Sequence, residues 1–180
     1  MADDLGRATR ILNQGGIVAY ATEYCFGLGC DPHNCNAVYR LLRIKRRPIS
    51  KGLIVIGADI GQFTPYVERF PREVLATWPG PHTWLLTPCP GVPRWITGHH
   101  ARIAVRVTAH PQAAALCRTV GMAIVSTSAN RTRESPVRNC REVLRRFGND
   151  VDYVLRGRVG DAPAPTPIRD AITGDLVRCG

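Results

Sequence analysis

The residues with the most evident chemistry lie early in the chain, between residues 15 and 56. Thr22 and Glu23 follow an apolar run at residues 17–21, and the helical pattern that comes next ends in three cations at residues 45–47. A hydroxyl and a carboxylate near clustered cations can hold a small polar molecule beside an anion. This stretch therefore predicts a binding site.

Lysine is rare in this chain and occurs only in the same stretch. Of the 24 basic residues, two are lysines, Lys45 and Lys51. Arginine keeps the charge of lysine but is larger and holds its donors in a planar fork. We therefore expect this stretch to need the compact ammonium group of lysine.

Residues 102–107 alternate in polarity, as a strand does when its two faces differ. Ile103, Val105 and Val107 fall on one face, and Ala104 lies between Arg102 and Arg106 on the other. A strand with two arginines on one face is either exposed to solvent there or lines a cleft. The alternation alone leaves both possibilities open.

The composition limits the size of the fold and the kind of partner. The chain has 180 residues, 44% of them hydrophobic, which suits one sizeable core, and we expect one domain over residues 1–180. The formal net charge of +10 favours anionic partners such as nucleic acid, nucleotides or acidic membranes. The chain starts without the pattern of a signal peptide and contains no apolar run that could cross a bilayer. We expect a soluble, cytoplasmic protein without a membrane partner.

The cysteines predict no metal centre. Seven is an odd number, and without a secretory signal reduced thiols are expected. Cys25, Cys30 and Cys35 recur at equal intervals, but their spacing is not that of a zinc knuckle, and His99 and His100 are expected in a solvated loop. We expect no tightly bound metal. The sequence also lacks Walker, metalloprotease and nucleophile-elbow patterns, which removes the main support for the commonest NTPase and hydrolase classes.

Helical and strand patterns alternate along the chain, which indicates an α/β fold. Helices are expected at residues 5–12, 111–120 and 141–147, together with a helix capped by Asn34 that ends at residues 45–47, and broken helical pieces at residues 62–76. Strands are expected at residues 17–21, 26–30, 53–56, 83–87, 102–107, 123–126, 151–155, 168–172 and 175–178. Residues 88–100 and 157–167 read as loops because they are rich in proline and glycine.

Several ordered motifs carry a resemblance to a known family. They are Tyr20-Ala21-Thr22-Glu23, Phe26-Gly27-Leu28-Gly29, Lys45-Arg46-Arg47-Pro48, Lys51-Gly52-Leu53, Trp78-Pro79-Gly80-Pro81, Ala104-Val105-Arg106-Val107 and Ser126-Thr127-Ser128-Ala129-Asn130. In this order they resemble the threonylcarbamoyl-AMP synthase (YrdC-like) family, in its short, single-domain bacterial form. The resemblance implies a twisted mixed sheet of parallel and antiparallel strands, with flanking helices, around a large basic cavity.

The resemblance also implies an activity. L-threonine, bicarbonate or CO2, and ATP would become L-threonylcarbamoyladenylate and pyrophosphate, for the formation of N6-threonylcarbamoyladenosine in tRNA. Proteins that transfer the threonylcarbamoyl group onward are the implied partners, and Mg2+ would accompany ATP.

The family motifs imply roles for individual residues. Those implied to bind ATP are Lys45, Arg47, Lys51, Ser128 and Asn130, with Arg178 as a weaker candidate, and Lys45, Arg47, Ser128 and Asn130 are also implied to be catalytic. The residues implied to bind threonine are Thr22, Arg106, Ser126 and Thr166. Arg106 would hold the threonine carboxylate with two donors, which arginine does better than lysine.

Simpler roles exist for single members of this set. Thr22 and Ser126 can satisfy backbone groups at strand ends, and the cations at residues 45–47 can complement a helix C-terminus. The ordered set of motifs outweighs these roles. One departure from the family is the loop at residues 131–134, where smaller residues are usual.

A second class of function stays open, which is a non-enzymatic module that binds tRNA or other structured, double-stranded RNA. A concave basic surface binds RNA through its phosphates alone. Arg141, Arg145 and Arg146 lie on one helix face and are expected to be solvated, with RNA contact as the alternative. Because a binding module needs charge but no particular threonine, serine or asparagine, the motifs favour the enzyme.

Overall fold

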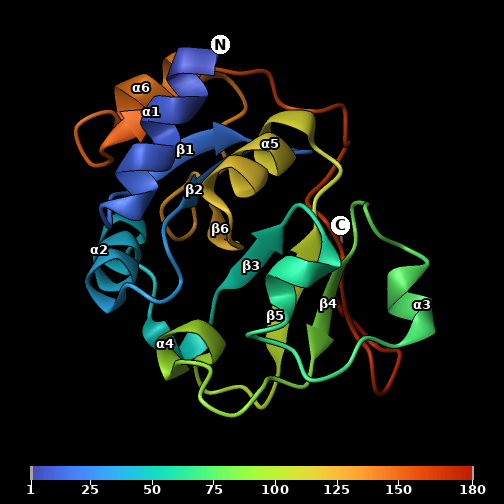
Figure 1. Ribbon diagram of the computed structural model, residues 1–180. Coiled ribbons are helices and arrows are strands. Elements are labelled where there is room, and N and C mark those ends of the chain that lie inside the picture. The colour runs from blue at the N-terminus through green and yellow to red at the C-terminus, as the bar shows by residue number, and fades with distance from the viewer. Residues whose placement is uncertain (1, 180) are drawn as a thin grey trace.

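The computed structural model describes residues 2–179 and contains a β-sheet with helices on both faces (Figure 1). The strands are β1 (Val18–Ala21), β2 (Phe26–Gly29), β3 (Ile54–Gly57), β4 (Thr83–Leu86), β5 (Ile103–Val107), β6 (Ile124–Ser128), β7 (Tyr153–Val154), β8 (Ile168–Asp170) and β9 (Leu176–Arg178). Within the described residues they form one nine-stranded sheet in the order β7-β1-β2-β6-β3-β5-β4-β8-β9.

The sheet is mixed, as predicted. β1 pairs in parallel with β7, β3 with β5 and β4 with β8, whereas the other neighbours are antiparallel. The residues that follow β1 and β5 meet although they lie far apart in the sequence, since Thr108 contacts Glu23 at 2.6 Å, and the end of β6 pairs with β2. The residues that follow or end these strands can therefore share one site.

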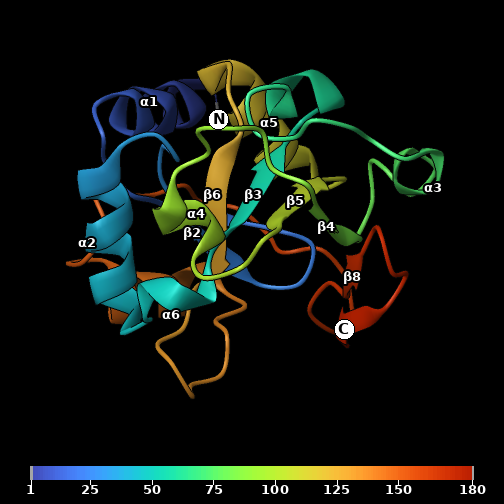
Figure 2. The same cartoon turned by 90° about the horizontal axis from the view of Figure 1, so that it is seen from below.

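The helices form a layer on each side of the sheet. They are α1 (Ala2–Asn13), α2 (Cys35–Lys45), α3 (Arg72–Leu75), α4 (Arg94–Thr97), α5 (Pro111–Val120) and α6 (Cys140–Phe147), with 3-10 helices η1 (Ile49–Lys51) and η2 (Ile60–Phe63). α1 packs on α5 over one face, where Val18 and Tyr20 of β1 join their apolar cluster (Figure 2). Ala19 and Ala21 point into the larger cluster on the opposite face, together with α2 and α6. β1 is thus buried on both faces, which its continuous apolar run predicts.

Helix α2 forms as the sequence predicts and delivers its cations to one end of the sheet. The side chain of Asn34 accepts a hydrogen bond from the backbone N–H of Ala37 at 3.0 Å. The helix ends at Lys45, and Arg46 takes a left-handed conformation ahead of Pro48, which disfavours helical geometry in the preceding residue. The cations therefore lie at the C-terminus of α2.

Several expected boundaries were wrong, among them the end of the strand expected at residues 168–172, since β8 ends at Asp170. Residues 88–100 are not all loop, because they contain the short helix α4. Its Ile96 is 1% exposed and anchors the helix in the core, and Gly98 ends the helix with a φ of 66°. The strand expected at residues 123–126 continues to Ser128, since β6 also pairs with β2. The strand expected at residues 151–155 is shorter, since β7 contains only Tyr153 and Val154. Among residues 2–179, no helix combines the length and the apolar character needed to cross a lipid bilayer.

Gly29 lies where two neighbouring groups approach the backbone closely, and a matched substitution tests this packing. A Cβ at Gly29 would lie 2.5 Å from the carbonyl oxygen of Val125 and 2.8 Å from the ring of Tyr20. We expect Gly29→Ala to lower the free energy of unfolding by about 1–3 kcal/mol, as overpacked cores do. Urea denaturation measures the change.

The control is Gly6→Ala on the exposed side of α1, where a Cβ would meet nothing within 4 Å. This substitution should raise the free energy of unfolding by about 0.5–1 kcal/mol, because alanine is the better helix former. Equal stability of Gly29→Ala and wild type would contradict the close approach.

Candidate functional site

A cavity of about 250 Å3 opens where β1, β3, β5 and β6 meet the C-terminal residues. Most of the sequence-predicted site residues line it. They are Thr22, Arg47, Arg106, Ser126, Ser128, Thr166 and Arg178. The wall also contains Glu23, the one acidic side chain among the described residues that line it. The site is therefore not uniformly basic, since guanidinium groups face a carboxylate.

Arg106 lies at the centre of this wall and is paired with Glu23. The Arg106 Nη2 atom is 3.2 Å from the Glu23 Oε2 atom, and the two residues are 6% and 9% exposed. The face of β5 that carries Arg106 therefore lines a cleft, which decides between the two possibilities that the sequence left open. A buried ion pair of this kind requires further hydrogen bonds to offset desolvation.

Three threonines supply those hydrogen bonds. Arg106 Nη1 donates to the hydroxyl of Thr166 at 2.7 Å and to that of Thr83 at 3.3 Å. Thr108 donates its hydroxyl to the Glu23 Oε1 atom at 2.6 Å. The guanidinium and the carboxylate are thus held from opposite sides by hydroxyl groups.

The electrostatic environment keeps Glu23 ionised. Burial alone would raise its pKa, but the Arg106 charge and the Thr108 hydrogen bond outweigh burial and hold the pKa below its usual value. At neutral pH the wall therefore contains a carboxylate beside a guanidinium. The Arg106 Nε atom is buried and has no hydrogen-bond partner among the described residues. The arginine retains donors for a further acceptor.

Thr22 and Ser126 both line the cavity wall, and Thr22 also forms a hydrogen bond to the backbone. The Thr22 hydroxyl donates to the carbonyl of Cys25 at 2.7 Å, which closes the turn between β1 and β2. Ser126 is buried in the middle of β6 and faces the same cavity. Both side chains are within the site that the motifs imply.

A second cavity of about 190 Å3 adjoins the first and shares Arg47 and Arg178 with it. Lys51 and Arg102 line only this second cavity. Arg47 is oriented by hydrogen bonds from its Nη2 atom to the carbonyls of Lys51 and Gly52, at 3.1 and 2.9 Å. Desolvation, followed by the charges of Arg106 and Arg47, lowers the pKa of Arg178. The crowding of these cations favours an anion between the two cavities.

Lys45 and Asn130 lie behind the wall and do not line either cavity. Lys45 is 4% exposed, and its Nζ atom donates to the carbonyl of Ser128 and, at 2.7 Å, to that of Asn130. The Asn130 side chain accepts from the Ser128 hydroxyl at 2.6 Å and donates to the carbonyl of Glu134 at 2.8 Å. Burial, followed by the charge of Arg47, lowers the pKa of Lys45 to about 8. The two motifs therefore fix each other through the backbone after β6.

The loop at residues 131–134 is tied to the same region. The backbone N–H of Thr132 donates to the carbonyl of Lys45 at 3.1 Å, Arg131 pairs with Asp150 at 3.0 Å, and Glu134 pairs with Arg146. One of the three arginines expected to be solvated on α6 is therefore engaged within the chain. The loop forms an ordered rim beside Ser128.

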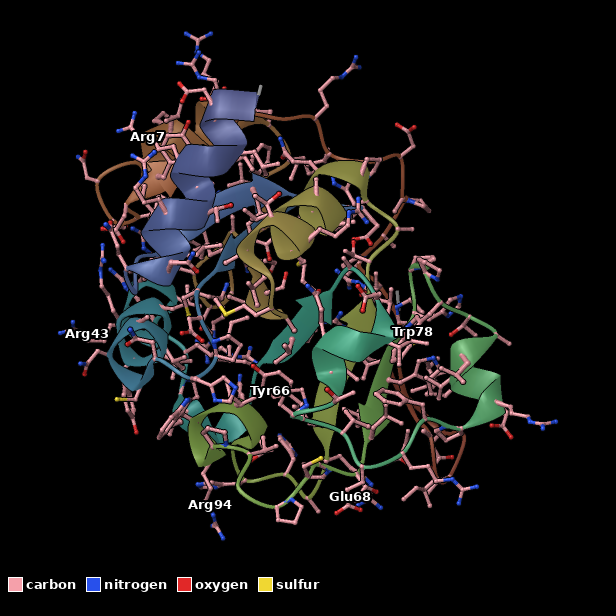
Figure 3. The ribbon with its side chains drawn as sticks, in the orientation of Figure 1. Arg7, Arg43, Tyr66, Glu68, Trp78 and Arg94 are labelled. Atoms are coloured by element: carbon pink, nitrogen blue, oxygen red, sulfur yellow. The ribbon has the colours of Figure 1, made fainter. Side chains whose placement is uncertain are left out.

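Other arginines are dispersed over the surface. Arg7, Arg43 and Arg94 are exposed on three different helices, and Figure 3 shows Arg43 and Arg94 pointing away from the sheet. The positive charge is thus not collected only around the cavities.

The sequence placed Glu23 in the predicted binding stretch without a role of its own, and it did not indicate Thr83 or Thr108 as site residues. Glu23 was visible as a polar residue at the end of an apolar strand, which is a usable signal. Thr83 and Thr108 had no such signal, because their part in the site depends on the pairing of β4 with β5 and β8.

Comparisons with known proteins agree on one family. The family model described as telomere recombination, which covers Sua5, YciO and YrdC, matches residues 10–180. The threonylcarbamoyl-AMP synthase of Coxiella burnetii (strain RSA 493 / Nine Mile phase I) is 47% identical over 95% of this chain and 94% of that protein. The one from Halorhodospira halophila is 50% identical over 93% and 90%.

The fold comparison agrees. The structure of P. abyssi Sua5 complexed with L-threonine superposes with a TM-score of 0.90 and 28% identity. The superposition covers 97% of this chain and 53% of the Sua5 chain, so this chain spans about half the length of that longer protein.

The two lysines provide a matched test of the arrangement behind the wall. Lys45→Arg places a larger planar group where a buried ammonium donates to two carbonyls, so we expect the free energy of unfolding to fall by about 1–3 kcal/mol. Lys51→Arg, at an exposed position, should change it by less than about 0.5 kcal/mol. Chemical denaturation measures both. A silent Lys45→Arg would mean that Lys45 does not hold the backbone after β6.

Proposed function

The chain belongs to the Sua5, YciO and YrdC family, and we infer from this and from the site that it is a threonylcarbamoyl-AMP synthase. The enzyme makes L-threonylcarbamoyladenylate for the modification of adenosine in tRNA. The observation that carries the assignment is the buried Arg106, held in a cavity that also contains crowded cations. One end of this cavity suits an amino-acid carboxylate and the other suits phosphates.

Arg106 is proposed to bind the carboxylate of L-threonine. Its Nη1 atom is occupied by Thr166 and Thr83, and one donor of Nη2 is directed to Glu23. The Nε–H and the second Nη2–H lie along one edge of the planar group, and this edge matches the two oxygens of a carboxylate. Thr22 and Ser126 supply hydroxyl groups nearby.

Arg47, Arg178 and Lys51 are proposed to bind the phosphates of ATP. Arg47 and Arg178 line both cavities, and Lys51 lines the second. Hydrogen bonds from Nε and Nη2 of Arg47 to backbone carbonyls fix the plane of its guanidinium before ATP arrives. Fixed donors of this kind stabilise the charge that develops on phosphoryl oxygens during transfer.

Ser128 is proposed to contact the nucleotide from the rim, and Asn130 is proposed to support it from behind the wall. Ser128 lies in the wall of the first cavity, and its hydroxyl is oriented by the side chain of Asn130. Lys45 supports this rim through two backbone carbonyls and retains a third N–H for a phosphate. Its contact with ATP remains a prediction.

We propose that Mg2+ accompanies ATP. Among residues 2–179, no three His, Cys, Asp or Glu side chains are grouped as metal ligands, and the charge of Glu23 in the cavity wall is paired with that of Arg106. The phosphates themselves would supply oxygen ligands to the ion, which would neutralise charge on them.

The proposed reaction balances in two steps. Bicarbonate takes a proton from the ammonium group of threonine and loses water to give CO2, and the free amine then adds to CO2 and loses a second proton to solvent, which leaves a carbamate. A carbamate oxygen then attacks the α-phosphorus of ATP, and the bond to the β-phosphate oxygen breaks to release pyrophosphate. The chain positions the carbamate near Arg106 and the phosphates near Arg47, so catalysis rests on orientation and charge. Proteins that transfer the threonylcarbamoyl group to tRNA would consume the adenylate.

The RNA-binding alternative finds less support in the geometry. Its charge requirement is met, but the structure commits Arg106 and Arg146 to partners within the chain and disperses other arginines over the surface. A phosphate-binding surface has no use for a buried carboxylate beside its central arginine.

A turnover assay tests the assignment. The protein should release pyrophosphate from ATP when L-threonine, bicarbonate and Mg2+ are present, and a labile adenylate should form in the same amount. Omitting threonine is the control and should abolish both products. Folded protein that releases no threonine-dependent pyrophosphate would refute the proposal.

Replacing Arg106 tests the threonine end. Arg106→Ala should weaken threonine binding by about 30-fold or more, equivalent to about 2 kcal/mol, because it removes the carboxylate partner and leaves Glu23 buried without its counter-ion. ATP affinity should change far less. Calorimetry of each substrate separately measures the two effects.

The matched control is Arg102→Ala, four residues earlier on the same face of the same chain segment but in the second cavity. It should leave threonine affinity unchanged. If Arg106→Ala binds threonine as tightly as wild type does, Arg106 is not the carboxylate site.

A further inference from the structure

Glu23 has no role in the reaction as derived so far, yet it is buried in the cavity wall next to the proposed carboxylate site. Its Oε1 atom accepts from Thr108 at 2.6 Å, and its Oε2 atom accepts from Arg106 at 3.2 Å. An ionised carboxylate has about four acceptor positions, so these two bonds leave capacity for a further donor.

The surroundings of Glu23 fix its position tightly. The backbone N–H of Ala162 donates to the carbonyl of Glu23 at 3.2 Å, and that of Gly160 donates to the carbonyl of Thr22 at 2.9 Å. A Cβ at Gly160 would lie 2.8 Å from the Glu23 carbonyl oxygen, so only glycine lets the two segments approach this closely. The carboxylate is therefore presented to the cavity on a rigid turn.

The chemistry of an α-amino acid matches this pair of charges. Its carboxylate and its ammonium are attached to the same carbon, so a ligand whose carboxylate binds Arg106 has its ammonium close by. A buried carboxylate 3.2 Å from the same guanidinium is the complementary partner for that ammonium.

We propose that Glu23 binds the amino group of the substrate, so that Glu23 and Arg106 together form a clamp for an α-amino acid. The proposal rests on threonine being the substrate, and it adds the residue that selects for an amine. It also explains why the wall combines opposite charges, since the zwitterion that binds is itself neutral.

The state of Glu23 favours binding over proton abstraction. Because the Arg106 charge and the Thr108 hydrogen bond hold its pKa below the usual value, the group stays ionised at neutral pH and is a weak base. Glu23 therefore holds and directs the amino group, and the two protons that the ammonium loses on the way to the carbamate pass to bicarbonate and to solvent.

The consequence is discrimination between amino acids and hydroxy acids. The α-hydroxy acid that has a hydroxyl in place of the amino group of L-threonine keeps the carboxylate and lacks the positive charge. Wild type should bind L-threonine at least tenfold more tightly than this analogue, because a charge-assisted hydrogen bond is replaced by a neutral one.

Calorimetry with both ligands, without ATP and bicarbonate, tests the proposal. In Glu23→Gln, which keeps the size of the side chain, threonine affinity should fall about tenfold or more and the analogue should bind as well as before or better. The ratio of the two affinities should then approach one. A purely structural role for Glu23 would weaken both ligands equally, and that result would overturn the proposal, as would unchanged affinities.

Thr108→Val is the matched control. It removes the hydroxyl that holds Glu23 but keeps the charge, so it should preserve a preference for threonine. If Glu23→Gln does not fold, the wild-type comparison decides, because equal affinity of wild type for both ligands refutes the clamp. Wild type that binds neither ligand would instead count against the proposed function.

Discussion

The buried pair of Arg106 and Glu23 is the interaction on which the site depends. Two charges removed from water destabilise a fold unless each finds partners, and here three threonine hydroxyls form hydrogen bonds to the two charged groups. The partners come from β4, the end of β5 and the C-terminal segment, while Glu23 follows β1. The ion pair can therefore be satisfied only when these segments have assembled, so correct folding and a formed site are the same condition.

The sheet provides this assembly through its order of strands. β5 lies between β3 and β4, and β4 pairs in parallel with β8, which brings the segment that carries Thr166 against Arg106. The backbone N–H of Thr83 donates to the carbonyl of Pro167 at 3.1 Å, and this bond fixes the approach of that segment. The long connection at residues 157–167, which reads as an irregular loop, thus closes one side of the cavity.

How well the sequence predicts the site depends on how far apart in the sequence the interacting residues lie. The alternation at residues 102–107 correctly places Arg106 opposite the apolar face of its strand, because side-chain direction is a local property. Whether that face is solvated depends on Glu23 and Thr166, which are 83 and 60 residues away. Local patterns do not contain such contacts, and the role proposed for Arg106 came from the family resemblance. Thr83 and Thr108 had neither a pattern nor a motif to identify them.

Lys45 shows that an argument from residue type alone can leave out a residue's main contacts. The scarcity of lysine indicates that a compact ammonium is needed, and the structure places a buried Nζ atom between the carbonyls of Ser128 and Asn130, where we expect the larger arginine fork to fit poorly. The partner is backbone, however, which no residue type reveals in advance. Since the same carbonyls belong to the turn that orients Ser128, the end of α2 and the end of β6 act as one unit. A lysine that never touched ATP would still determine where the nucleotide rim lies.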